Sequence, residues 1–270
     1  MDQNTGRVLF EKNSHEVKNS ASLMKIMNML LAIESLENNE MEENDNVTIS
    51  DNAASVKGTN VWLKSGENAT VSDLVKSISM VSASDAALAL AEHMEKSEGK
   101  FVFEMNKRAA ELQMKDTIFK DCIGSDEDGN VTSAHDVALM SRELMKHEKI
   151  LPYTSTWIDH IRDGQTQLVN TNKLLKTYSG TTGLKTGTTE KAGSCIAATA
   201  EKNKIKVIGV ALGCKDLKER DKEIARILDY GFSEYVMATP APPKELPRFV
   251  KIKNGRLSEV EINIPLSESV

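Results

Sequence analysis

A serine and a lysine three positions apart lie in an apolar run near the start of the chain, at Ser22 and Lys25 in "SASLMKIMNMLLAIESL". Residues three apart share one face of a helix, so the hydroxyl and the amine are predicted to come within reach of each other. Apolar side chains surround them on nearly every side of the predicted helix, from about Ser22 to Leu36, as is typical of a buried helix. Burial disfavours an ammonium ion, and a neutral amine beside a hydroxyl is a general base beside a nucleophile. A helix-capping serine followed by a lysine that reaches solvent fits the same two residues, and the pattern alone leaves both interpretations open.

The same serine-lysine spacing occurs a second time, at Ser97 and Lys100 in "EKSEGK". These residues lie in a polar joint, where nothing is predicted to desolvate the lysine. We therefore interpret the second copy as chance.

A second cluster of hydroxyls lies in "SMVSASDAALALAEHM", where Ser82 and Ser84 fall at the break between two helical patterns. Asp85 is predicted to cap the second of these helices. Side chains at such a joint can project into a cleft. Ordinary serines of a helix-turn-helix would produce the same pattern.

The third feature is "GLKTGTT", residues 183–189, at the start of a predicted β-hairpin. An exposed strand edge offers backbone N–H groups, while Lys185 and Thr186 offer a cation and a hydroxyl. Together these groups suit an anionic ligand and a developing oxyanion. A turn with a solvated lysine is the alternative.

Composition narrows the classes of function. The chain has 270 residues, is 40% hydrophobic and 27% charged, and carries a net charge of −6, which is typical of a globular protein without a basic surface for nucleic acid. No apolar run is long enough to span a bilayer. The five histidines form neither H-x-H nor H-E-x-x-H, so we expect no metal and no cofactor. The cysteines, Cys122, Cys195 and Cys214, are odd in number and predict no disulfide framework, although one pair stays open.

Periodicity predicts an α+β fold. Residues 1–13 are predicted to form a strand, an Asn-Thr-Gly turn and a second strand, with the first strand clipped at residue 1. Helical spacing dominates from about 70 to 150, and "CIAATA", "EKNK" and "IKVIGVALG" then predict an antiparallel hairpin, followed by the long helix "LKERDKEIARILDYGFSEYV". The Pro-rich "TPAPPKELP" is predicted to be a linker, and "FVKIKNGRLSEVEINI" a second hairpin that begins a larger module.

The three features occur in the order S-x-x-K, S-x-S and K-T-G, which is close to the S-x-x-K, S-x-N and K-T-G signature of penicillin-binding proteins and β-lactamases. With "TGRVLFEKN", "TSAHDVALMSRELM" and "GLKTGTTEKAG" in family order, the chain resembles the low-molecular-mass penicillin-binding proteins that are D-alanyl-D-alanine carboxypeptidases, over roughly residues 1–235. The resemblance implies a β-lactamase/transpeptidase-like fold: an antiparallel sheet flanked by helices, plus a helical lobe. It implies a catalytic domain at 1–238, with sheet residues in 1–20 and 180–238 and the lobe at about 40–165, and then a linker with the start of a small C-terminal β domain at 239–270.

The resemblance also implies a reaction and its catalytic residues. Ser22 attacks the carbonyl of a terminal D-alanyl-D-alanine bond and forms an acyl-enzyme, while Lys25 takes its proton. Ser82 passes a proton to the departing D-alanine. The implied substrate is a peptidoglycan stem peptide, and β-lactams are the implied inhibitors.

Substrate-binding positions follow from the same resemblance. Lys185 and Thr186 hold the second motif and the substrate carboxylate, Gly187 belongs to the same substrate-binding motif, and the backbone N–H groups of Ser22 and Thr188 form the oxyanion hole. Arg220 matches an arginine that binds the terminal carboxylate, as guanidinium does in a bidentate manner. An exposed helix arginine paired with Glu219 or Glu223 is the alternative for that residue.

Ser84 departs from the family pattern, which has asparagine there. A serine is shorter and offers one donor instead of two, so reduced turnover is expected. The alternative is a weakly active or non-catalytic member that binds penicillin or peptidoglycan. A class A β-lactamase is disfavoured, because no E-x-x-L-N segment lies between Ser82 and Lys185.

The resemblance implies a protein of the cell envelope, outside the cytoplasm. The printed sequence shows neither a signal-peptide pattern nor the C-terminal amphipathic helix by which relatives attach to the membrane. We therefore expect a trimmed or partial version of an exported protein, attached to membrane only through segments that this chain lacks.

Overall fold

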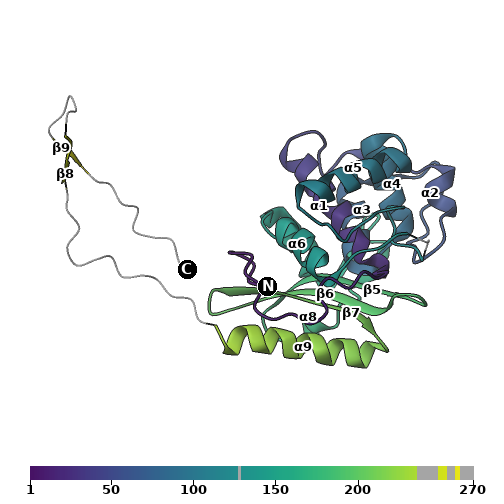
Figure 1. Cartoon of the computed structure of the whole chain (residues 1–270). Coiled ribbons are helices and arrows are strands. Elements are labelled where there is room, and N and C mark those ends of the chain that lie inside the picture. The colour runs from purple at the N-terminus through teal and green to yellow at the C-terminus, as the bar shows by residue number, and fades with distance from the viewer. Residues whose placement is uncertain (127–128, 236–248, 254–258, 262–270) are drawn as a thin grey trace. The chain divides into compact units, whose positions relative to one another are not determined.

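The computed structural model describes residues 1–126, 129–235, 249–253 and 259–261. Two units can be separated, Met1–Ser233 and Glu234–Val270. The first unit combines an antiparallel sheet with a lobe of helices, and it contains every predicted site residue (Figure 1). None of the described helices has the length and apolar character that crossing a membrane requires.

The sheet of the first unit consists of three antiparallel strands, in the order β5 (Thr181–Thr189), β6 (Gly193–Lys202) and β7 (Ile205–Cys214). The link between β6 and β7 is short because Asn203 and Lys204 adopt φ angles of 52° and 67°, as a two-residue hairpin of type I′ requires. Figure 1 shows α9 (Leu217–Ser233) along one face of the sheet and the helical lobe over the other. Both the predicted hairpin and the α+β fold are confirmed.

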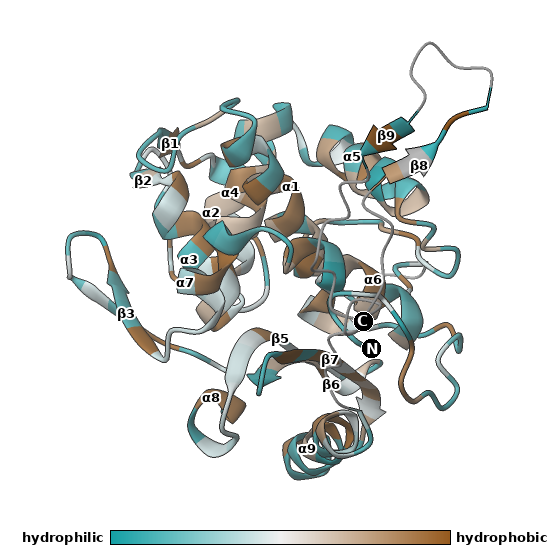
Figure 2. Ribbon diagram, turned by 90° about the vertical axis from the view of Figure 1, so that its left-hand side faces the viewer, coloured by the Kyte–Doolittle hydropathy of each residue, from teal (hydrophilic) through white to brown (hydrophobic). Residues whose placement is uncertain are grey.

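Helix α9 faces the sheet with a stripe of buried residues spaced three or four positions apart: Arg220, Ile224, Leu228 and Gly231. Because α9 covers one face and α6 packs on the other, the middle of β6 is buried on both sides, from Ser194 to Ala200. Apolar colouring in Figure 2 is concentrated on these packed surfaces, and the connecting loops are mostly hydrophilic.

The helical lobe is built around α1 (Lys25–Glu37). Because α1 is buried on nearly every side, its sequence is a continuous apolar run. Four side chains of this helix, Ile26, Met27, Leu30 and Ile33, are 0% exposed. The helices of the lobe are η1 (Ala21–Met24), α1 (Lys25–Glu37), α2 (Asp51–Ser55), α3 (Val71–Val81), α4 (Ser84–Glu95), α5 (Glu98–Glu111), α6 (Ala134–Leu144), η2 (Glu148–Ile150) and α7 (Leu151–Thr154). Short elements complete the unit: β1 (Asn46–Thr48) with β2 (Asn68–Thr70), β3 (Ile158–Ile161) with β4 (Thr166–Val169), and α8 (Leu174–Thr177).

The two strands predicted at residues 1–13 are not formed. Asp2 makes an isolated antiparallel bridge to Val207, and Met1 exchanges backbone hydrogen bonds with Ile208. A turn follows, closed by Gly6 N–H donating to Asp2 O at 3.0 Å. The prediction was wrong because a strand needs a partner along its length, and the local alternation of residue types does not supply one.

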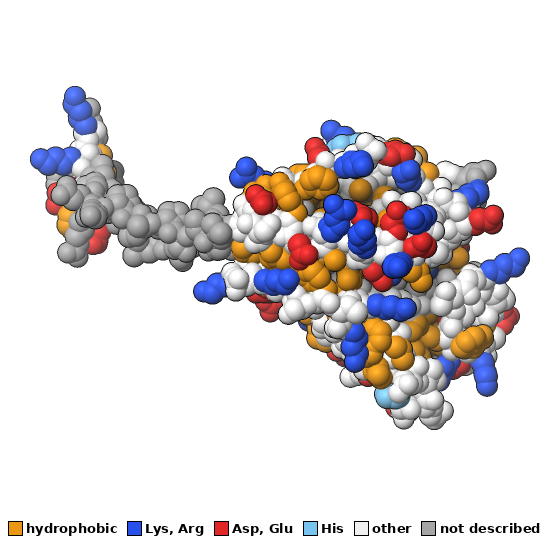
Figure 3. Space-filling model, turned by 90° about the horizontal axis from the view of Figure 1, so that it is seen from below, with side chains coloured by type: hydrophobic (Ala, Val, Ile, Leu, Met, Phe, Trp, Pro, Cys, Tyr) orange, Lys and Arg blue, Asp and Glu red, His pale blue; other side chains and the backbone are white. Residues whose placement is uncertain are grey.

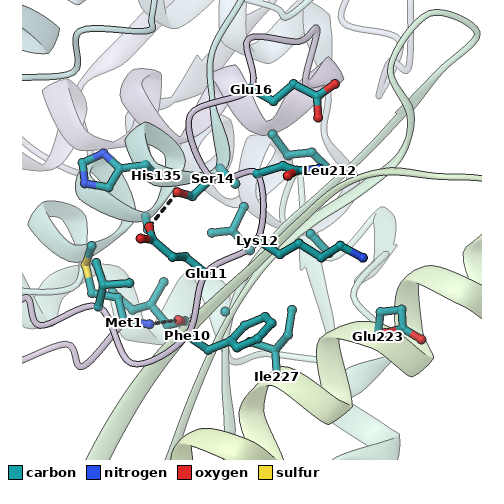
Figure 4. Close-up of a pocket in the computed structure, with 18 of the residues that line it drawn as sticks. Met1, Phe10, Glu11, Lys12, Ser14, Glu16, His135, Leu212, Glu223 and Ile227 are labelled. Atoms are coloured by element: carbon teal, nitrogen blue, oxygen red, sulfur yellow. Dashed lines mark hydrogen bonds between the residues drawn. The ribbon is translucent and has the colours of Figure 1, made fainter.

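Beyond this bridge a cavity of about 650 Å³ lies between the N-terminal segment, β7 and α9. Figure 4 shows Phe10 and Lys12 of that segment opposite Leu212 of β7 and Ile227 of α9. None of the predicted site residues lines this cavity. Its size therefore does not identify it as the reaction site.

On the α9 side of the molecule, Figure 3 shows Lys and Arg side chains mixed with Asp and Glu side chains. Ion pairs one helical turn apart are part of this pattern, such as Arg226 with Glu223 at 3.1 Å. This face is the solvated surface expected from the alternating charges of the sequence.

In the second unit, β8 (Phe249–Lys251) pairs antiparallel with β9 (Glu259–Glu261), as the predicted hairpin requires. The Asn-Gly turn of this hairpin and the Pro-rich linker at 239–247 lie outside the described residues.

Candidate active site

Ser22 lies on a tight turn rather than in a regular α-helix. It is the second residue of η1, and the residue before it, Ala21, has a φ of 51°. A left-handed alanine is a strained backbone conformation, and such strain concentrates at functional sites. The turn leaves Ser22 only half-buried, whereas its neighbours Ala21 and Leu23 are 2% and 0% exposed.

Lys25 is the buried amine that the sequence predicted. Its side chain is 1% exposed, and its Nζ donates to Ser22 Oγ at 3.2 Å, to Ser84 Oγ at 3.4 Å and to the carbonyl of Ile123 at 2.5 Å. Burial lowers the pKa of Lys25 to about 8, against the opposing effect of Cys122, Asp121 and Asp85 nearby. A much larger share of this amine is therefore neutral near neutral pH than for a solvated lysine.

The Ile123 carbonyl belongs to a loop that the sequence reasoning missed. Asp121 shapes this loop: its Oδ1 accepts from the N–H groups of Ile123 at 3.0 Å and Gly124 at 2.6 Å, and its carboxylate also binds Ser125. A carboxylate that collects successive backbone N–H groups is a local turn signal, readable in "KDCIGS". No sequence pattern predicts that this loop folds over Lys25, because the contact is to a backbone carbonyl 98 positions away.

Ser82 and Ser84 lie at the joint between α3 and α4, as predicted. Ser82 ends α3 with a φ of 65°, and within the described part of the chain its buried Oγ has no hydrogen-bond partner. Ser84 is 4% exposed and turns its hydroxyl toward Lys25. The predicted cap was wrong: the N-cap of α4 is Ala83, and Asp85 accepts instead from the N–H groups of residues 61 and 63.

The K-T-G residues lie in the middle of β5, beside the turn that carries Ser22. A Cβ atom added to Gly187 would lie 2.8 Å from the backbone nitrogen of Ser22, so only glycine lets the strand pass this close. Thr188, the next residue, is exposed. The buried hydroxyl of Thr186 hydrogen-bonds Thr171 Oγ1 at 2.7 Å. The structure thus brings the first and third motifs into direct contact.

Lys185 is 1% exposed and donates to the carbonyl of Thr186 at 2.9 Å. Its pKa is lowered well below the ordinary value, chiefly by burial and further by the positive charges of Lys25 and Arg220. No ion pair joins Lys185 to another residue in the described ranges. A bound anion would be favoured here, since it would offset these charges.

Arg220 is not the exposed residue that one alternative described. It is 3% exposed, in the buried stripe of α9, and its guanidinium binds Asp221 Oδ1 through Nε at 2.9 Å and Nη2 at 2.7 Å. Neither Glu219 nor Glu223 is its partner in these contacts. Arg220 nevertheless lies close enough to Lys185 to affect its charge.

The second S-x-x-K pair has an ordinary structural role. Ser97 is the N-cap of α5 and accepts from the N–H of Lys100 at 3.4 Å. Both residues are exposed, so nothing desolvates this lysine. The interpretation of this copy as chance is consistent with that geometry.

One group of potential metal ligands occurs among the described residues: Glu34, Glu143 and His147. The guanidinium of Arg108 pairs with Glu34 at 2.6 Å and with Glu143 at 3.1 Å, so a cation already lies between the carboxylates. Glu34 lies on α1, nine positions after Lys25, but its carboxylate is engaged by Arg108, so we assign these residues to an ion-pair cluster and not to a metal site.

All three cysteines are free. Cys122, in the loop over Lys25, is buried, and burial raises the pKa of its thiol well above the ordinary value. A protonated, enclosed thiol is a weak nucleophile. The hydroxyl of Ser22 is therefore the nucleophile that the geometry favours at this site.

Comparison with known proteins identifies the family of the chain. The D-alanyl-D-alanine carboxypeptidase family profile matches residues 1–216. The chain is 39% identical over 265 residues to the D-alanyl-D-alanine carboxypeptidase DacF of Bacillus subtilis, covering 97% of this chain and 68% of that protein.

Two solved structures share the fold. The D-alanyl-D-alanine carboxypeptidase DacD of Francisella tularensis superimposes with a TM-score of 0.83 at 26% identity, covering 100% of this chain and 76% of the other. Penicillin-binding protein D2 of Listeria monocytogenes, in its ampicillin-bound form, gives a TM-score of 0.78 at 30% identity over 86% of this chain and 95% of the other. The protein described here is a member of the D-alanyl-D-alanine carboxypeptidase family of serine peptidases.

Proposed function

We propose that Ser22 is the nucleophile with which this carboxypeptidase removes the terminal D-alanine from peptidoglycan stem peptides. The observation that carries the proposal is the enclosed amine of Lys25, 3.2 Å from Ser22 Oγ. The neutral amine takes the hydroxyl proton as the oxygen attacks the carbonyl carbon, and the peptide is left as an ester on Ser22. Water then hydrolyses this acyl-enzyme.

The departing D-alanine needs a proton, and Ser82 is our candidate to deliver it, regaining in turn the proton that Lys25 took from Ser22. Its hydroxyl is buried at the same joint as Ser84 and has no protein partner among the described residues. An unpaired buried hydroxyl costs stability, and a substrate nitrogen would supply the missing partner. We assign Ser82 to the leaving-group side of the reaction for this reason.

The oxyanion hole is assigned to the backbone N–H groups of Ser22 and Thr188. The close approach of β5 at Gly187 supports this, because it aligns the strand with the start of η1. One such donor typically contributes about 3 kcal/mol to stabilisation of the transition state.

The free carboxylate that distinguishes a carboxypeptidase substrate is assigned to Lys185 and Thr186, with Arg220 behind them. Burial and the neighbouring charges of Lys25 and Arg220 lower the pKa of Lys185, and a carboxylate bound beside it would oppose that effect. Because Asp221 holds the guanidinium of Arg220, we assign to Arg220 a contribution through its charge rather than direct bidentate contact.

Benzylpenicillin tests the nucleophile. Incubation followed by intact-mass measurement and peptide mapping should show one adduct on Ser22, and we expect it to persist because no E-x-x-L-N segment between Ser82 and Lys185 supplies a glutamate to activate water. The Listeria relative is known in ampicillin-bound and cefotaxime-bound forms, which makes the same class of inhibitor a reasonable probe. An unchanged mass after long incubation with excess drug would exclude Ser22 as the nucleophile.

A second function is favoured by Ser84 alone: a member that binds penicillin or peptidoglycan but turns over poorly. Release of D-alanine from a peptide that ends in D-Ala-D-Ala separates the two. Acylation with no detectable release would favour the binding protein, whereas release, even at a low rate, supports the carboxypeptidase. In either case we propose an extracytoplasmic location, where this substrate occurs.

A further inference from the structure

A solvent-exposed tryptophan lies three residues after Thr59, whose carbonyl accepts from Ser84 N–H. Trp62 is 81% exposed, although its neighbours Val61 and Leu63 are 5% and 4% exposed. Its φ is 55°, a conformation that is a genuine outlier for a bulky residue. Within the described part of the chain, no aromatic ring or cation packs on the indole.

The backbone on either side of Trp62 is held by two buried or paired charges. Asp85 Oδ2 accepts from Val61 N–H at 3.1 Å and from Leu63 N–H at 3.0 Å. Arg162 donates to the carbonyls of Val61 and Trp62, each at 3.2 Å. These four hydrogen bonds hold the backbone around Trp62 in its strained conformation, and strain of this kind is typical of binding sites.

The same segment is part of the active-site wall. Gly58 lies against Ser84, since a Cβ atom added there would lie 2.7 Å from Ser84 Oγ. The carbonyl of Thr59 accepts from Ser84 N–H at 2.6 Å. Asp85, which holds Trp62 in place, is close enough to Lys25 to affect its charge. Trp62 therefore belongs to a rigid rim on the Ser84 side of Ser22.

We propose that Trp62 is a specificity residue whose indole packs on the acyl-donor part of the substrate, the part that stays bound to Ser22. This inference rests on the proposed function. Ser82 and Lys185 are assigned to the departing D-alanine and its carboxylate, whereas Gly58 and Thr59 contact Ser84, so we assign the rim that carries Trp62 to the half of the substrate that stays bound. An exposed tryptophan on a firmly held backbone offers a large apolar surface, and residues of this type dominate binding energy at interfaces.

The test compares two β-lactams that share the same bicyclic ring system and differ in the acyl side chain. Benzylpenicillin carries an aromatic acyl side chain, and 6-aminopenicillanic acid carries none. Trp62→Ala should lower the acylation rate with benzylpenicillin about tenfold and change that with 6-aminopenicillanic acid less than about twofold. Trp62→Phe should recover most of the loss, and Phe103→Ala, at an aromatic side chain on α5 that is 67% exposed, should change neither rate.

Fluorescence gives an independent measurement, because the chain has two tryptophans. In Trp157→Phe, Trp62 is the sole indole, and its emission should shift to the blue on acylation by benzylpenicillin but not by 6-aminopenicillanic acid. Equal losses with both compounds in Trp62→Ala, or no emission change in Trp157→Phe, would overturn the inference while leaving Ser22 as nucleophile. Absence of any adduct in the unaltered protein would overturn the proposed function together with it.

Discussion

The pH dependence of acylation tests the role of Lys25 most directly. If its neutral amine is the base, the rate with a β-lactam follows the neutral fraction and rises with pH. Burial lowers the pKa of Lys25 to about 8. Relative to a solvated lysine of pKa about 10.4, this corresponds to about 3 kcal/mol in favour of the neutral form and a neutral fraction of about one in ten at pH 7.

The expected curve has a definite shape. Between pH 7 and pH 8 the second-order rate constant should rise about fivefold, and between pH 8 and pH 9 less than about twofold, because the amine is then mostly neutral. Stopped-flow acylation with a fluorescent penicillin measures this, after subtraction of drug hydrolysis in buffer. A rate that still rises about tenfold per pH unit at pH 9 would refute the reasoning, because Lys25 would then titrate as a solvated lysine.

Asp121→Asn provides a second test, because two effects of this substitution would shift the midpoint of the pH curve in opposite directions. The carboxylate favours the ammonium form of Lys25, so its removal should move the midpoint of the curve to lower pH. If the substitution instead opens the loop and hydrates Lys25, the midpoint should move to higher pH. The direction of the shift therefore separates lost charge from lost enclosure.

Three other substitutions, with Lys100→Ala as a control, test the site. Lys25→Ala should abolish acylation with an unchanged circular dichroism spectrum, while Lys100→Ala, on the exposed face of α5, should not alter the rate; equal effects would show that the wrong pair was chosen. Gly187→Ala places a methyl group 2.8 Å from the nitrogen of Ser22. The rate of acylation should therefore fall at least tenfold, and the free energy of unfolding should fall by about 1 to 3 kcal/mol. An unaffected rate would argue against an oxyanion hole at this position. Ser84→Asn should raise kcat/KM for D-alanine release about tenfold, and a slower variant would show that the cleft is built around serine.

The spacing of residues along the sequence was enough to predict contacts within a single helical turn. Ser22 and Lys25 meet because residues three apart share a face, and the desolvation of Lys25 followed from the apolar residues around it. Arg220 could have been placed in the core by the same logic. It begins the stripe that continues with Ile224 and Leu228, which indicates burial even though arginine is usually exposed.

Contacts between distant segments could not be predicted in the same way. The carbonyl of Ile123 carries no side-chain signature, so its bond to Lys25 depends on how the lobe packs. The strands expected around Val8 and Phe10 have the right alternation, yet these residues are 40% and 51% exposed. Strand formation requires a partner edge, and pairing is a property of the whole fold.

The geometry around Lys25 also indicates where a serine at position 84 acts. The bond from Lys25 to Ser84 Oγ is long, at 3.4 Å, whereas that to the Ile123 carbonyl is 2.5 Å, so the loop holds the amine more firmly than Ser84 does. A shorter side chain at 84 then costs Lys25 little of its positioning. The loss must therefore affect substrate binding. The hydroxyl of Ser84 offers the substrate one donor, whereas the side-chain amide of an asparagine at this position would offer two. Acylation by a small β-lactam should therefore suffer less than turnover of a peptide, and the two rates should separate most clearly in the unaltered protein.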